Sequence, residues 1–69
     1  MSRQNTRTSN ARRNYMEQRI AGHDERITEI VDKGLYTEFY TSDESGDVRV
    51  QYRVYGTNDN NFRVYSKEI

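Results

Sequence analysis

The chain has 69 residues, with 11 basic and 11 acidic residues and no cysteine. These totals limit it to one small domain and exclude disulfide bonds, zinc–thiolate sites and thiol chemistry. Only 12 residues are Leu, Ile, Val or Phe, so the core must be small. The zero net charge and the six tyrosines nevertheless favour a folded chain, and self-association would help to stabilise it.

The N-terminal third of the chain is basic and the remainder is acidic. Residues 1–22 have five arginines and one glutamate, a net charge of +4, and residues 23–69 have a net charge of −4. Residues 1–9 lack apolar periodicity, and we expect them to form a disordered basic tail. Residues 10–69 are then expected to form the single folded domain.

A helical pattern begins near Asn10. Spacings of 4, 3, 4, 3 and 1 separate residues that would form one stripe on a helix: Met16, Ile20, His23, Ile27, Ile30 and Val31. We predict one helix over about residues 10–33, ended by Gly34. Gly22 leaves an alternative open, because it could divide this segment into two helices.

After Gly34 the apolar period changes to two, which is typical of strands. Strands are predicted at about residues 35–42, 48–56 and 61–66, separated by the turn sequences DESGD and GTNDN. The predicted fold is therefore α+β, with an N-terminal helix packed on one face of a three-stranded antiparallel meander. This order of elements is similar to the start of a double-stranded-RNA-binding domain, although the C-terminal helix of that family is missing.

The last two predicted strands repeat one pattern, QYRVYG at 51–56 and NFRVYS at 61–66. If Val54 faces Phe62, both apolar sets face the helix and Arg53 lies opposite Arg63, an unfavourable pairing of like charges. A four-residue loop at 44–47 would place Glu38 opposite Arg53. The other side of the sheet would then present nine side chains as a predicted partner-binding face: Tyr36, Glu38, Tyr40, Arg49, Gln51, Arg53, Tyr55, Arg63 and Tyr65.

Tyrosine and arginine are enriched in binding interfaces, and they also suit stacking on bases and contact with phosphates. The alternative is an ordinary polar outer side of an antiparallel sheet. The segment NARRNYMEQR resembles the arginine-rich helical RNA-binding peptides of phage antitermination proteins. Through this resemblance and its positive charge, the N-terminal arm offers five possible phosphate contacts: Arg3, Arg7, Arg12, Arg13 and Arg19.

Other polar groups of the sequence do not form a recognisable site. His23 is expected to be a packing residue, because there is no second histidine or cysteine to complete a metal site. The acidic segment SDESGD lacks the ligand pattern of a calcium-binding loop and is expected to be a hairpin turn. No nucleophile–base set is evident, so we expect neither catalysis nor a cofactor.

Two functions therefore follow from the sequence as hypotheses. The first is a small non-catalytic protein-binding module, similar in style to the phage and mobile-element inhibitors that include anti-CRISPR proteins, acting on a nucleic-acid-handling host complex. The second is a small nucleic-acid-binding regulator that uses the arginine-rich arm. With either function we expect a cytoplasmic protein that forms a homodimer and does not insert into membranes.

Overall fold

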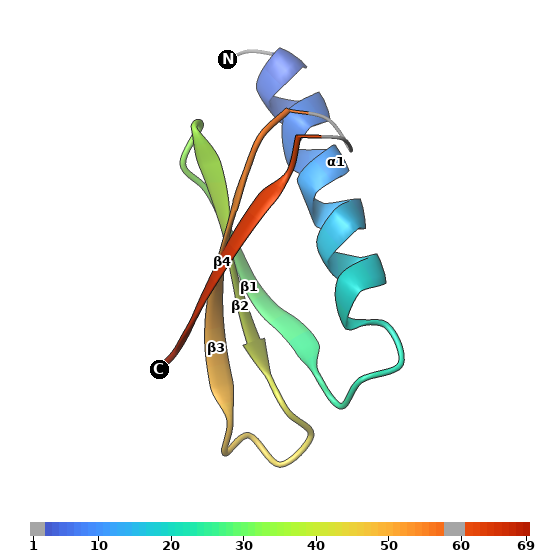
Figure 1. The fold of residues 1–69 in the computed structure, drawn as a ribbon, viewed down its shortest axis with the longest axis vertical. Helices are drawn as coiled ribbons and strands as arrows, with labels where there is room; N and C mark the ends of the chain where they lie inside the picture. Colours follow the sequence, from blue (N-terminus) through green and yellow to red (C-terminus); the bar gives the residue numbers. More distant parts are fainter. Residues whose placement is uncertain (1–2, 58–60) are drawn as a thin grey trace.

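The computed structural model describes residues 3–57 and 61–69, with side chains from residue 10 onward. One helix is followed by a four-stranded antiparallel sheet, so the fold is α+β. The helix lies along one side of the twisted sheet, and the C-terminus lies at the end of the last strand (Figure 1). The strand order β1-β2-β3-β4 is a meander in which β1 and β4 form the edges.

The helix, α1, spans Arg3–Ile20, so its predicted bounds are wrong at both ends. Residues 3–9, which we expected to be disordered, are helical in the structure, and Met1 and Ser2 lie outside the described residues. The chain leaves the helical path at Gly22, whose φ is +83°. Glycine adopts this positive φ without the strain that a side chain would cause, so Gly22 ends the helix. Within the described part of the chain, no helix has the length and apolar character needed to cross a membrane.

The second half of the predicted helix is instead strand β1, Arg26–Asp32. Its sequence RITEIVD is rich in β-branched residues, which pack well on a pleated surface. The sheet therefore has four strands and not three. The three predicted strands are β2 at Tyr36–Ser42, β3 at Arg49–Tyr55 and β4 at Arg63–Glu68.

The hairpin between β2 and β3 has the predicted register. Glu38 pairs with Arg53 across the two strands. The backbone N–H of Asp43 donates to the carbonyl of Val48 at 3.0 Å, which closes the four-residue loop at 44–47. The Asp43 carboxylate accepts hydrogen bonds from the backbone N–H groups of Gly46 and Val48, at 2.7 and 3.2 Å, and so holds this turn.

The register of the hairpin between β3 and β4 differs from the prediction by two residues. Val54 pairs with Val64 rather than with Phe62, and Arg53 pairs with Tyr65 rather than with Arg63. A shift of two keeps every side chain on its predicted side of the sheet. It also removes the unfavourable pairing of the two arginines.

The core lies between α1 and the sheet and is small. Met16, Ile20, Phe39 and Val54 are buried, and they form one cluster. Five partly buried side chains pack against this cluster: Tyr15, Ile27, Tyr52, Phe62 and Val64. Among the residues that the structure describes, one helix therefore covers one side of the sheet and no element lies over the other side.

Arg12 joins the helix to two turns of the sheet, although its guanidinium is polar and its exposed fraction is only 2%. The guanidinium donates to the carbonyl oxygens of Gly34, Leu35 and Gly56, at distances of 2.8–3.2 Å. It also donates to the Thr37 hydroxyl at 3.1 Å. Burial lowers the pKa of Arg12 below its ordinary value, and the charge of Asp32 opposes this shift.

Candidate partner-binding face

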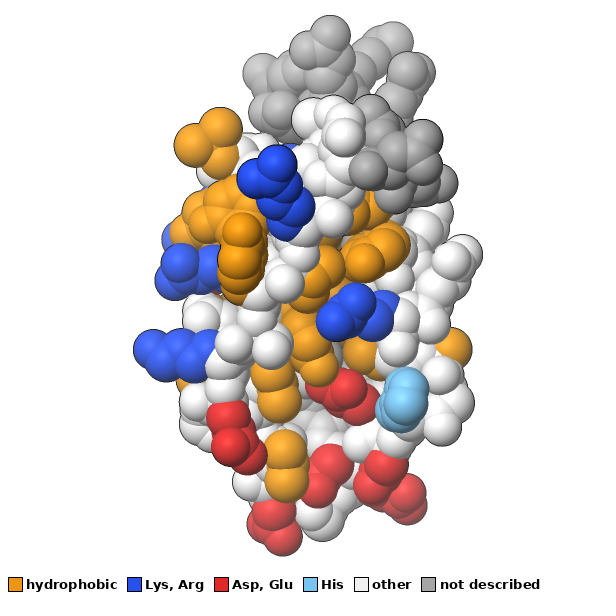
Figure 2. All heavy atoms as spheres, viewed as in Figure 1, with side chains coloured by type: hydrophobic (Ala, Val, Ile, Leu, Met, Phe, Trp, Pro, Cys, Tyr) orange, Lys and Arg blue, Asp and Glu red, His pale blue; other side chains and the backbone are white. Residues whose placement is uncertain are grey.

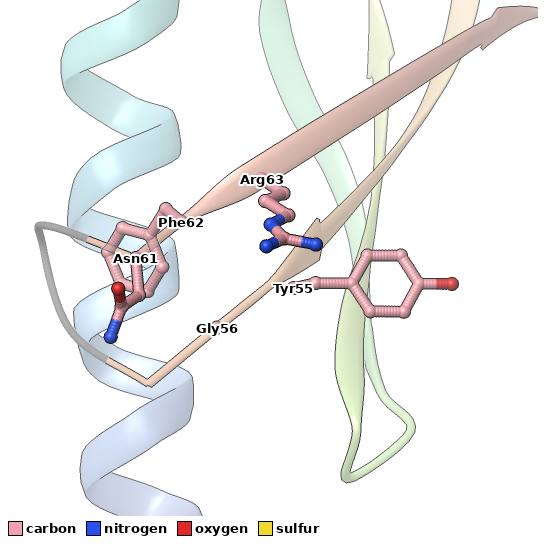
Figure 3. A pocket seen from close by; sticks show the side chains of 5 residues that line it. All are labelled: Tyr55, Gly56, Asn61, Phe62 and Arg63. Atoms are coloured by element: carbon pink, nitrogen blue, oxygen red, sulfur yellow. The ribbon is translucent and has the colours of Figure 1, made fainter.

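We call the side of the sheet that faces away from α1 the outer face. Side chains alternate along each strand, and those next to buried Phe39 and Val54 point away from the helix. Figure 3 shows this alternation near the β3–β4 connection, where the Phe62 ring lies on the helix side and the Tyr55 ring points the other way. All nine residues of the predicted partner-binding face fall on strands at positions of the outer face.

Three tyrosine rings and one arginine form a continuous platform on the outer face. The ring centroids of Tyr36 and Tyr55 are 4.8 Å apart. Tyr65 meets Tyr55 edge-on at 5.7 Å, and more than half of Tyr65 is exposed. The Arg53 guanidinium lies over the Tyr36 ring, 5.4 Å from its centroid, within range of a cation–π interaction. The platform thus comes from three neighbouring strands and one packed set of rings.

A hydrogen-bonded polar centre lies beside this platform. The Glu38 side chain is only 9% exposed, and its Oε2 lies 3.7 Å from Nε of Arg53. Its Oε1 accepts a hydrogen bond from the Tyr40 hydroxyl at 3.1 Å. The Gln51 amide in turn donates to the Tyr40 hydroxyl oxygen at 3.0 Å. These contacts fix the orientation of the polar side chains before any partner binds.

The outer face is cationic along β3 and β4. These two strands place only basic and neutral side chains on this face, and the basic ones are Arg49, Arg53, Arg63 and Lys67. Arg53 pairs with Glu38, whereas the other three form no ion pair with described residues. Sequence reasoning missed Lys67, because the predicted strand ended at residue 66.

Charges are segregated over the molecule (Figure 2). Acidic side chains gather at the end that holds the α1–β1 loop and the β2–β3 turn, and these two segments are joined by a hydrogen bond from the backbone N–H of Glu44 to Asp24. Separate basic side chains lie in the middle and upper part of the visible face, among hydrophobic ones. Along β3 and β4, the outer face has a local excess of positive charge that the zero net charge of the chain hides.

The five arginines proposed for phosphate contacts have different surroundings. Arg12 is buried and donates to protein oxygens, which speaks against its predicted contact with phosphate. Arg13 is exposed and pairs with Glu17 at 3.0 Å. Arg19 is also exposed, in the last turn of α1. The side chains of Arg3 and Arg7 lie outside the described residues.

His23 does not pack in the core as predicted, because the helix ends before it and leaves it exposed in the α1–β1 loop. The described residues contain no group of three or more His, Asp or Glu side chains placed to hold a metal ion. Desolvation acts to raise the pKa of Asp43, but hydrogen bonds from Val48, Ser45 and Gly46 outweigh it and hold that pKa below its usual value.

A second polar cluster, which sequence reasoning missed, lies at the edge of the core. Oε2 of Glu25 accepts hydrogen bonds from the hydroxyls of Thr41 and Tyr52, both at 2.6 Å. Burial, followed by the hydrogen bond and the charge of Glu25, raises the pKa of Tyr52 to about 12. This cluster ties the α1–β1 loop to the sheet. Its residues are far apart in the sequence, and no local sequence pattern indicates that they meet.

Comparisons with protein-family models, with curated proteins and with solved structures find no match. A functional interpretation therefore depends on the geometry of this chain alone.

Proposed function

We propose that this protein is a small non-catalytic module that binds a partner protein through the outer face. The observation that carries the proposal is the platform of Tyr36, Tyr55 and Tyr65 with Arg53, whose side chains pack against one another and are not covered by any described element. Tyrosine and arginine supply most of the binding energy in many protein interfaces. Side chains that are already ordered lose less entropy on binding, so a fixed platform favours affinity.

The buried Glu38 supports this proposal. Burial of a carboxylate to 9% exposure costs free energy unless the carboxylate is paired, and Glu38 is buried in this way on the side of the sheet away from the helix. Its contacts with Arg53 and Tyr40 satisfy it and hold both neighbours in place. An ordinary solvated face does not need such a fixed polar centre, whereas a binding surface gains specificity from one.

Two narrower hypotheses lie within this proposal. Inhibition of a nucleic-acid-handling host complex, in the manner of phage anti-defence proteins, rests on small size, polarity and tyrosine content alone. Nucleic-acid binding through the N-terminal arm is the competing function, and the burial of Arg12 removes one of its five proposed contacts. Homodimer formation and a cytoplasmic location remain predictions from composition.

Capture of the partner by matched variants tests the proposal. Tyr65→Ala and Arg63→Glu change exposed side chains of the outer face, whereas Arg13→Glu makes the same change in charge as Arg63→Glu on the helix surface. We expect the two outer-face variants to lose a protein that the wild type and Arg13→Glu retain from a lysate of the source organism, after nuclease treatment. Equal capture by all four proteins would contradict the proposal.

A further inference from the structure

The two edges of the sheet differ in how well they can accept another strand. An edge strand leaves every second pair of backbone N–H and C=O groups without a partner in the sheet. In β1 the pairing register shifts between Ile27 and Glu29, and such a bulge obstructs regular pairing on that edge. The register of β4 runs without interruption from Arg63 to Glu68, so β4 is the regular edge of the sheet.

Almost the whole of β4 is open to solvent. Of its six residues, only Val64 is partly buried, and the others are exposed. Over β3 and β4, a hollow of about 250 Å³ is lined by Gln51, Arg53, Tyr65, Ser66 and Lys67. A strand added at this edge would therefore meet free backbone groups, with the rim of this hollow on the neighbouring strand.

The charges along β4 indicate which side chains such a strand should have. Arg63 and Lys67 both point to the outer face, four residues apart, and neither forms an ion pair with described residues. Tyr65 lies between them on the same face, and Val64 points to the core side. A complementary strand has acidic residues opposite Arg63 and Lys67, a β-branched residue opposite Tyr65 and an apolar residue opposite Val64.

We propose that the partner docks an extended acidic segment against β4 as a fifth strand, with Glu or Asp at two positions four residues apart and an apolar residue between them. This inference rests on the proposed function and names the chemistry of the partner. The carboxylate opposite Lys67 pairs with the Lys67 ammonium at the rim of the hollow. Backbone hydrogen bonds to β4 supply affinity, and the two carboxylates supply specificity.

Two other occupants fit the same edge less well. A second copy of this chain, paired antiparallel in the register centred on Tyr65, would place Arg63 of each copy opposite Lys67 of the other, and like charges facing each other across a sheet are unfavourable. A nucleic acid would meet the cations but lacks the peptide N–H and C=O groups that continue a β-ladder. The regular edge therefore favours a peptide chain, and the charge favours an acidic one.

The test uses a short capped peptide with the core sequence Glu-Val-Thr-Val-Glu, which is the same in both chain directions and so fits a parallel or an antiparallel strand. The full-length protein, labelled with ¹⁵N, is titrated with this peptide, with the Lys-Val-Thr-Val-Lys peptide and with Glu-Pro-Thr-Pro-Glu. The hydrogen bond from the Ile69 N–H to the Arg49 carbonyl turns the backbone groups of the odd-numbered residues of β4 toward β3, so those of Val64 and Ser66 face the open edge, and these prolines remove the donors that an antiparallel strand would direct at them. Polyuridylate and inorganic phosphate are titrated separately. Sedimentation at the same protein concentrations reports self-association.

We expect the glutamate peptide to shift the backbone amides of β4 and its neighbour β3, and to bind roughly tenfold more tightly than the lysine peptide, because two ion pairs are replaced by two repulsions. The double variant Arg63→Glu/Lys67→Glu should reverse this preference. The proline peptide should bind more weakly than the glutamate peptide.

Four results would overturn the inference: equal binding of the two charged peptides, shifts centred on β1, tighter binding of polyuridylate at equal charge concentration, or a β4 edge already occupied by a second copy. The outcome is separable from that of the proposed function. If outer-face variants lose the partner but the peptide does not bind β4, only the fifth-strand inference fails. If the peptide binds β4 but the variants retain the partner, the proposed function fails.

Discussion

Replacement of the buried Arg12 should destabilise the protein more than replacement of any exposed residue of α1. Arg12→Met keeps much of the side-chain length but leaves three carbonyl oxygens and the Thr37 hydroxyl without their donor. Leaving one buried acceptor unpaired costs about 1 kcal/mol or more, and water can reach some of these sites, so we expect a total loss of about 3 kcal/mol. A domain of this size has a stability of roughly 3–10 kcal/mol, so the loss is a large fraction.

Thermal unfolding followed by circular dichroism measures this effect. A loss of about 3 kcal/mol should lower the Tm by roughly 12–24 °C in a domain of this length. Arg13→Met is the matched control, because Arg13 is an adjacent, exposed arginine with one ion pair, and its removal should change stability by less than about 1 kcal/mol.

A milder variant tests the same contacts of Arg12 if Arg12→Met does not fold. Thr37→Val preserves the shape of the side chain and removes one of the four acceptors, so it should lower the stability by about 1 kcal/mol. Similar Tm values for Arg12→Met and Arg13→Met, or an unchanged Tm for Thr37→Val, would refute the assignment of Arg12 as the link between the helix and the two turns.

Three further predictions concern the turns and the core. Gly56→Ala should destabilise the fold by about 2 kcal/mol or more, because its Cβ would lie 2.5 Å from a backbone oxygen at a φ of 113°, whereas Gly46→Ala has free space and should cost about 1 kcal/mol in thermal unfolding. Ultraviolet titration should show that Tyr52 ionises at about pH 12, and that Glu25→Gln lowers the pKa of Tyr52. Because the folded state holds this proton more firmly than the unfolded state, the stabilisation from the Tyr52 hydroxyl is full below about pH 10 and is lost as the pH rises toward 12. Met16→Ala should lower the unfolding free energy by about 2–4 kcal/mol in urea denaturation, and a smaller loss than that of an exposed-residue control would contradict the burial of Met16.

The β2–β3 hairpin was predictable because local signals determine it. Alternating residues on both strands, together with a turn of fixed length, set the pairing of Glu38 with Arg53. The β3–β4 hairpin was predictable only in part. Its longer connection permits registers that differ by two residues and leave every side chain on the same face, and the charges of Arg53 and Arg63 were the one available signal against the predicted register.

Strand β1 was mistaken for helix for a specific geometric reason. Ile27 and Ile30 are three residues apart, a helical spacing, yet both lie on the core side of the sheet, opposite Thr41 and Phe39. The bulge between Ile27 and Glu29 offsets the strand alternation by one residue and produces this spacing. Period alone therefore could not separate a bulged strand from a helix.

The candidate site was predictable to the extent that the alternation of side chains along each strand determines it. All nine predicted residues lie on the outer face because a two-residue change of register leaves every side chain on the same face. The burial of Arg12 was not predictable, since its acceptors come from two turns and from Thr37 of β2, all 22 or more residues away in the sequence. From the composition, Arg12 was interpreted as part of a basic arm that contacts phosphates. The structure shows instead that Arg12 holds the helix against the sheet.

The central claim, that the outer face binds a protein partner, is tested most directly by site-specific photo-crosslinking in cells of the source organism. A benzophenone amino acid is placed at Tyr65 on the outer face and, in a control protein, at exposed His23 in the α1–β1 loop. We predict one dominant crosslinked protein from the Tyr65 position that is insensitive to nuclease and absent from the His23 position. Crosslinks that form equally at both positions, or that join Tyr65 mainly to nucleic acid, would contradict the claim.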